Sequence, residues 1–141
     1  MTRVVWSAGR QPASALVRSA WHTGLVSETP PWISGAEWLT LPAVAQLMGE
    51  TPGRVRRLLD DHHLVAMRVD GVLKIPADFL VDGRPLAPLR GTVMVLLDRG
   101  FTNDEIVEWL METEETIGKA PIAVLRAGRK SEVRRVAQSL G

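Results

Sequence analysis

The chain has 141 residues, a net charge of +1 and no cysteine, and 45% of its residues are hydrophobic. This length fits one domain or a small domain with appendages, and the lack of cysteine excludes disulfides and thiolate metal sites, so we expect a cytoplasmic protein. The apolar runs are far shorter than the roughly 18 residues that span a bilayer, and the first residues lack the apolar segment of a signal peptide.

Charge is distributed unevenly along the chain. Seven carboxylates and one arginine lie between Asp98 and Glu115, whereas six cations and one glutamate lie between Lys119 and Arg135. Residues 54–57 contain three arginines. A chain that is nearly neutral in total can therefore carry a basic local surface, and nucleic-acid binding depends on that surface.

The N-terminal residues show neither helical nor strand periodicity. They mix Ser, Thr, Pro and Gly with scattered apolar residues, and Pro30-Pro31 and Ser34-Gly35 are typical breakers of regular structure. We therefore expect a flexible arm over residues 1–36. An alternative is that translation starts at Val26 from a non-AUG codon, so that residues 1–25 are not made. The intact mass of the native protein distinguishes the two.

Two short helices are predicted next. Thr40 is a typical N-cap, apolar residues follow it at helical spacing, and Gly49 is typical of the position just past a helix end. Thr51 and Pro52 are again a cap and a first-turn proline, and they begin a second helix that runs to about Asp61. Two short helices joined by so tight a turn predict a helix-turn-helix.

A β-hairpin is predicted directly after these helices. Residues 64–68 and 72–75 are apolar and β-prone, and Asp70-Gly71 between them is the typical loop of a two-residue type I′ turn. A hairpin in this position is a wing. The pattern therefore indicates a winged helix-turn-helix.

The remainder of the chain is predicted to be helical. A helix over residues 88–99 is followed by one that begins with a capping box formed by Thr102 and Glu105. A last helix over about residues 121–140 is broken near Gly128.

Three parts are therefore expected: the flexible arm over residues 1–36, a winged helix-turn-helix over 37–86 and a C-terminal helical region over 87–141. The expected fold class is mainly α with a small β-hairpin.

The second helix of the helix-turn-helix carries most candidate DNA contacts. If its apolar residues face the core, Arg54 and Arg57 share an exposed stripe with Arg56 beside it. The N-terminal part of this helix enters the major groove in such proteins, where arginine donates paired hydrogen bonds to guanine or neutralises phosphates. The alternative is a solvated face with an Arg56–Asp60 pair worth about 0.3–0.5 kcal/mol. Three arginines in four positions favour DNA.

The wing offers two further cations. With the two-residue loop, Arg68 lies opposite Leu73 and Lys74 opposite Met67, so the cations point to opposite faces and only one contacts a phosphate directly. The face favours Lys74, whereas nearness to the tip favours Arg68, and both stay open. The candidate DNA-binding residues are thus Thr51, Arg54, Arg56, Arg57, Arg68 and Lys74.

A second basic stretch lies near the C-terminus. It is either a solvated helix or an auxiliary phosphate-binding surface, or it is attracted to the acidic helix over residues 104–115, within the chain or across a homodimer. The carboxylates of that helix are expected on its outside. The auxiliary basic residues are Arg126, Arg129, Lys130, Arg134 and Arg135.

Chemistry of other kinds is not indicated. His62-His63 are adjacent, so on a helix they diverge by about 100° and lack a third ligand, and no metal site is expected. No nucleophile–base signature, phosphate loop or zinc spacing is visible. We therefore expect no enzyme activity and no cofactor.

Several motifs occur together in this chain: Trp38-Leu39-Thr40-Leu41-Pro42, Leu64-Val65-Ala66, Ile75-Pro76, Glu108-Trp109-Leu110, Val124-Leu125-Arg126-Ala127-Gly128-Arg129 and Glu132-Val133-Arg134-Arg135. In this combination the chain resembles the actinobacterial winged-helix DNA-binding proteins typified by a mycobacterial substrate of a Ser/Thr protein kinase. The resemblance covers about residues 37–140. It implies binding of double-stranded DNA by the winged helix and regulation by a Ser/Thr protein kinase that phosphorylates an N-terminal threonine.

The phosphorylation site stays open, because the N-terminal arm does not align with the tail of that family. Thr2, Thr23 and Thr29 are the candidates, and only Thr29 remains if the chain starts at Val26. A phosphate beside a DNA-binding surface weakens binding by repulsion.

Two functions are therefore weighed. The first is a sequence-reading, double-stranded DNA-binding protein that regulates transcription, whose C-terminal helices give support or a homodimer interface. The second is a protein-interaction adaptor that uses the acidic residues 104–115 or the basic residues 126–135. The pattern Trp109-Leu110, Gly118, Pro121-Ile122 and Leu125 is also loosely similar to the toxin-binding end of certain helix-turn-helix antitoxins.

Overall fold

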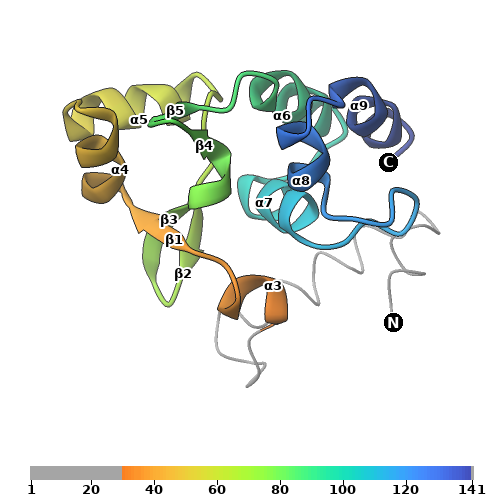
Figure 1. Cartoon of the computed structure of the whole chain (residues 1–141), viewed down its shortest axis with the longest axis horizontal. Helices are drawn as coiled ribbons and strands as arrows, with labels where there is room; N and C mark the ends of the chain where they lie inside the picture. Colours follow the sequence, from red (N-terminus) through yellow and green to blue (C-terminus); the bar gives the residue numbers. More distant parts are fainter. Residues whose placement is uncertain (1–29, 141) are drawn as a thin grey trace.

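The computed structural model describes residues 30–140, which form two adjoining halves (Figure 1). The first half contains a small sheet and the short helices α3 to α5, and the second contains the helices α6 to α9. Residues 1–29 lie outside the described residues, and with them the alternative start at Val26 and the candidate phosphorylation sites Thr2, Thr23 and Thr29.

The last residues of the predicted arm have regular structure. Helix α3 spans Pro31–Ser34, with proline in its first turn, where a missing N–H breaks no helical hydrogen bond. Ile33 is buried in the core. The indole Nε1 of Trp38 donates a hydrogen bond of 2.9 Å to the carbonyl of Ile33. The prolines that suggested a break therefore lie at the start of a short helix.

Both helices of the predicted helix-turn-helix are present. Helix α4 spans Leu41–Met48 and helix α5 spans Pro52–Asp60. The hydroxyls of the N-cap residues Thr40 and Thr51 each accept a hydrogen bond from the backbone N–H three residues on, at 3.3 and 3.2 Å. Gly49 ends α4 in the left-handed conformation at φ 67°, so the chain reverses within a few residues. The winged helix-turn-helix begins as predicted.

The predicted wing is the hairpin of strands β2 (Met67–Val69) and β3 (Val72–Pro76). Asp70 and Gly71 join the strands with positive φ angles of 53° and 81°, as a type I′ turn requires. The strands pair in the register that this loop predicted.

A third strand, which the sequence did not predict, completes the sheet. Strand β1 (Trp38–Thr40) pairs antiparallel with β3, so the strand order is β1-β3-β2. Three residues are too few to show the alternation of apolar and polar residues by which a strand is recognised.

The segment after the wing also has regular structure that was not predicted from the sequence. A 3-10 helix, η1 (Ala77–Phe79), leads into a small second hairpin of β4 (Leu80–Val81) and β5 (Arg84–Pro85). Asp82 and Gly83 turn this hairpin with φ angles of 52° and 72°. The tripeptide Val-Asp-Gly, which identifies the wing, thus occurs a second time and again forms a turn.

The second half consists of four helices in the described part of the chain. The predicted capping box is confirmed, because Thr102 N donates to the Glu105 carboxylate at 2.8 Å and Glu105 N donates to the Thr102 hydroxyl at 3.2 Å. The predicted break at Gly128, which has φ 85°, separates the last two helices. Among residues 30–140, no helix has the length and apolar character needed to cross a membrane. The helices are α6 (Leu89–Asp98), α7 (Asn103–Met111), α8 (Pro121–Arg126) and α9 (Lys130–Gln138).

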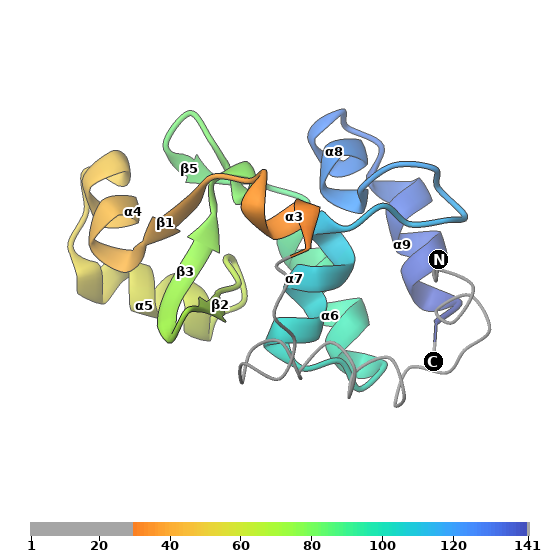
Figure 2. The ribbon, with the colours of Figure 1, turned by 90° about the horizontal axis from the view of Figure 1, so that it is seen from below.

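One hydrophobic core extends through both halves. The sheet lies between α4 and α5 on one side and the C-terminal helices on the other (Figure 2). Helix α7 packs against β2, and α8 packs against η1. The largest fully buried side chains include Met67 in β2, Phe79 in η1 and Trp109 in α7. The C-terminal helices therefore support the winged module directly.

Two carboxylates of the acidic segment lie inside this core. Glu108 is 1% exposed and Glu114 is 3% exposed. One carboxylate oxygen of Glu114 accepts a hydrogen bond of 3.2 Å from the indole Nε1 of Trp109, and the other accepts one of 2.7 Å from Thr116 N. The expectation that these carboxylates lie on the outside was wrong for Glu108 and Glu114. A fully buried indole N–H needs an acceptor, and Glu114 supplies it.

Arg126 connects the C-terminal half to the segment after the wing through hydrogen bonds. Its Nη1 donates hydrogen bonds of 2.9 Å to the carbonyl of Asp78 and 2.8 Å to that of Leu80. These contacts join residues that are 48 and 46 positions apart in the chain. From the sequence, Arg126 was expected to be an auxiliary phosphate-binding residue, whereas in the structure it makes contacts within the fold.

We expect the substitution Glu114→Ala to lower the free energy of unfolding by about 1–3 kcal/mol, because it leaves the buried N–H of Trp109 without its acceptor. Urea unfolding monitored by tryptophan fluorescence measures this loss. Glu115→Ala is the matched control, since Glu115 is exposed and adjacent. An equal loss in both variants would contradict the structural role of Glu114.

We expect Arg126→Ala to lower the free energy of unfolding by about 1 kcal/mol. This loss is smaller than that for a buried charged hydrogen bond because Arg126 is exposed to solvent. The same urea titration tests it against Arg135→Ala, which removes an exposed cation from α9. If the two variants are equally stable, the contacts of Arg126 contribute nothing measurable.

Candidate nucleic-acid interface

Helix α5 presents three arginines to solvent, whereas two of its apolar residues lie in the core. Val55 is 0% exposed and Leu58 is 6% exposed. On a helix each residue turns by about 100° from the last, so Arg54 and Arg57 lie about 60° apart. Both are exposed, as the sequence predicted for one stripe. This stripe is the most direct candidate contact with a DNA groove.

Arg56 is also exposed but faces a different direction from Arg54. The two residues differ by about 200° around the helix. Arg56 lines a cavity of about 410 Å³ together with Asp60 and His62. The rest of the wall is mostly apolar, and it comes from the start of α4, the 64–66 segment, Leu73 of the wing and Asn103 at the start of α7. Arg56 is therefore less directly aimed at a groove than the stripe.

Thr51 is exposed at the N-terminus of α5. Its hydroxyl oxygen already accepts the hydrogen bond from Arg54 N at 3.2 Å. The hydroxyl proton stays available as a donor, so a cap of this kind is compatible with a phosphate contact.

The wing cations occupy unlike positions. Arg68 lies opposite Leu73 and Lys74 lies opposite Met67, as predicted. Arg68 is exposed, and its Nη1 reaches the carbonyl of Gly71 at the turn, at 3.4 Å, near the limit of a hydrogen bond. Lys74 is half-buried in the central strand. The side chain of Arg68 thus lies at the wing tip, whereas that of Lys74 is flanked by neighbouring strands.

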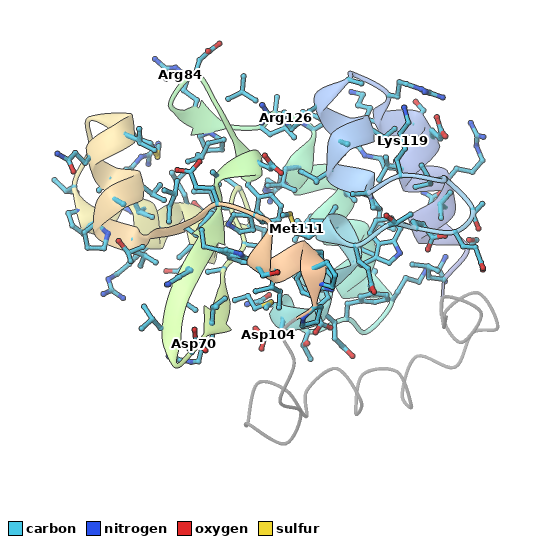
Figure 3. The ribbon with its side chains drawn as sticks, turned by 60° about the horizontal axis from the view of Figure 1, so that its bottom comes forward. Asp70, Arg84, Asp104, Met111, Lys119 and Arg126 are labelled. Carbon is cyan, nitrogen blue, oxygen red and sulfur yellow. The ribbon has the colours of Figure 1, made fainter. Side chains whose placement is uncertain are left out.

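The tips of the two hairpins lie at opposite edges of the molecule. Figure 3 shows Asp70 at the tip of the wing and Arg84 in the second hairpin far from it, and the two other views agree. The second hairpin is therefore not part of the surface that carries the wing tip.

The auxiliary basic residues do not form one patch. Arg126 binds the carbonyls described above, and Arg129 forms an ion pair with Glu132. The side chain of Arg134 is half-buried and occupies the space that a Cβ at Gly91 would take. Lys130 and Arg135 are exposed on different sides of α9.

One cation near α5 was not among the predicted residues. Arg90 is exposed at the start of α6, and its Nε donates a hydrogen bond of 2.9 Å to the carbonyl of Asp61, just past the end of α5. These residues are 29 positions apart, and no local pattern in the sequence indicates their contact.

The adjacent histidines do not suggest a metal centre. His62 is half-buried with φ 66°, and His63 is exposed. Within residues 30–140, no group of three His, Cys, Asp or Glu side chains is arranged to hold an ion.

Known protein families match both halves of the chain. Residues 34–80 match the family described as "DNA-binding protein Rv2175c, wHTH domain", and residues 86–141 match the "Rv2175c C-terminal domain of unknown function". The chain is 30% identical to the DNA-binding protein Rv2175c of Mycobacterium tuberculosis, with 94% of this chain and 97% of that protein covered. It also superimposes on the NMR structure of Rv2175c with a TM-score of 0.69 and 28% identity, over 81% of this chain and 84% of that one. These matches confirm the resemblance and the winged helix-turn-helix fold, and the chain belongs to the family of the DNA-binding protein Rv2175c.

Proposed function

We propose that this protein binds double-stranded DNA, with α5 in the major groove and the wing on the phosphate backbone, and that it regulates transcription. The observation that carries the proposal is the exposed stripe of Arg54 and Arg57 on a helix that Val55 and Leu58 anchor in the core. The family supports it, since the relative that covers nearly the whole chain is named a DNA-binding protein.

The stripe suits both kinds of DNA contact. A guanidinium donates two parallel hydrogen bonds to the N7 and O6 atoms of guanine, which gives specificity. The same group neutralises a phosphate, which gives affinity that falls with salt. Arg54 lies near the N-terminus of α5, the part that enters the groove in helix-turn-helix proteins. We assign the reading of bases to Arg54 and Arg57 and a secondary role to Arg56 and Thr51.

Of the two wing cations, we assign the phosphate contact to Arg68. It is exposed and lies two residues from the turn, whereas Lys74 is half-buried between its neighbours in the central strand. A phosphate contact requires a cation that reaches past the protein surface.

Regulation and assembly complete the proposal. The family resemblance supports a Ser/Thr protein kinase as a partner, and added phosphate charge on an N-terminal threonine would weaken DNA binding by repulsion. A homodimer would place two winged modules on half-sites about one helical turn apart. Selection of bound duplexes from a random library tests DNA reading and dimerisation together, since a dimer selects a symmetric site.

We expect Arg54→Ala and Arg57→Ala each to weaken binding to the selected duplex by about 1–3 kcal/mol, and to relax base preference at the position that each side chain reads. Fluorescence anisotropy titration measures the affinity. Arg99→Ala is the control, because it removes an exposed arginine outside the winged module. If both α5 variants bind like the parent, α5 is not the recognition helix. If the parent fails to retard any duplex at micromolar concentration and low salt, the protein acts as an adaptor instead.

We expect Arg68→Ala to weaken binding equally for all sequences and to reduce the slope of log affinity against log salt concentration by about one, as the loss of one phosphate contact does. Lys74→Ala is expected to leave the slope unchanged. Titrations at several salt concentrations measure both slopes. The opposite result, with only Lys74→Ala reducing the slope, would reassign the contact to the other face of the wing.

A further inference from the structure

Two cations of α9, Lys130 and Arg134, lie close together next to the start of α6. Lys130 is the first residue of α9 and Arg134 lies one turn later, so their side chains share one side of the helix. Lys130 is exposed, and the guanidinium of Arg134 packs against Gly91. Their common side faces the start of α6.

A small cavity lies at this junction of α6 and α9. Its volume is about 210 Å³, and both cations line it. The remaining lining residues are Ala87, Pro88 and Gly128, so no acidic side chain contributes to the wall. The space equals that of several water molecules at about 30 Å³ each, which is enough for one phosphate group. Shape and charge therefore both suit a phosphate.

The Arg134 side chain is held in place at this cavity. Its guanidinium occupies the position where a Cβ at Gly91 would lie. Its Nε is buried and has no hydrogen-bond partner among the described residues. A buried donor of this kind is costly unless it is satisfied.

The cavity adjoins the recognition helix through α6. Arg90, which donates to the carbonyl of Asp61 at the end of α5, directly precedes Gly91. Helices α5, α6 and α9 also follow one another along the same edge of the molecule (Figure 1). These contacts connect the wall of the cavity to the end of α5 through α6.

We propose that the cavity between α6 and α9 binds a backbone phosphate of DNA that flanks the site read by α5, with Lys130 and Arg134 as its ligands. This inference rests on the proposed DNA binding and adds a contact outside the winged module. Lysine contributes a point charge, and arginine contributes a planar pair of donors, a combination typical of phosphate binding. The C-terminal half thereby lengthens the footprint on DNA without reading bases.

The test compares two duplexes that share the selected site. The short one, of about 12 base pairs, ends at the site, and the long one extends by about one helical turn, 10 base pairs, on each side. Anisotropy titrations with the full chain should show tighter binding of the long duplex. Lys130→Gln should weaken binding to the long duplex on the order of threefold near 0.2 M salt and reduce its salt slope by about one, with the short duplex unaffected.

Two further variants make the result specific. Arg135→Gln removes the same charge from the same helix outside the cavity, and it should leave the preference for the long duplex intact. Gly91→Ala places a methyl group where the Arg134 guanidinium lies, and it should reproduce the effect of Lys130→Gln, with circular dichroism verifying the fold.

Equal effects of Lys130→Gln and Arg135→Gln, or no preference of the parent for the long duplex, would overturn the inference. Failure of the proposed function looks different: Arg54→Ala and Arg57→Ala then leave the affinity for the short duplex unchanged. A parent chain that binds neither duplex overturns both.

Discussion

The burial of Val55 and Leu58 is the constraint on which the interface depends. Helix α5 has only nine residues, so two inward side chains fix its rotation about its own axis. With these residues in the core, Arg57 points away from it, Arg54 lies at the border of the buried side, about 40° from Leu58, and Arg56 lines the adjoining cavity. The direction of the arginines is therefore decided by packing, and no hydrogen bond of their own is needed to aim them.

The sequence predicted the winged module well because its signals are local. An N-cap threonine, a glycine past a helix end and an Asp-Gly loop each restrict a few neighbouring backbone angles. The loop also fixed the register that places Arg68 opposite Leu73 and Lys74 opposite Met67, since a shift of one residue would turn every side chain to the other face. Strands β1, β4 and β5 were missed because two or three residues carry no usable alternation.

The errors concern contacts between distant parts of the chain. From the sequence, Glu114 looks like an ordinary surface carboxylate. Only the structure shows that it accepts a hydrogen bond from the buried indole of Trp109. Arg126 and Arg129 look alike in sequence, yet one holds two carbonyls far along the chain and the other pairs within its own helix turn. Residue type and spacing identify the charge but not its partner, and the partner decides whether a cation serves the fold or remains for a ligand. The roles of the candidate DNA-binding residues stay predictions for the same reason.

The bonds from Arg126 to the carbonyls of Asp78 and Leu80 also bear on how this architecture has been assembled. The two matched regions, 34–80 and 86–141, are separate along the chain. The Arg126 guanidinium of the second region nevertheless donates hydrogen bonds to backbone carbonyls of the first. In a winged helix that ends after residue 80, those carbonyls would form hydrogen bonds with water instead, and the surface of β2 that α7 covers would be exposed to solvent. In this chain, replacing either part by an unrelated domain would therefore require new packing where the two parts meet.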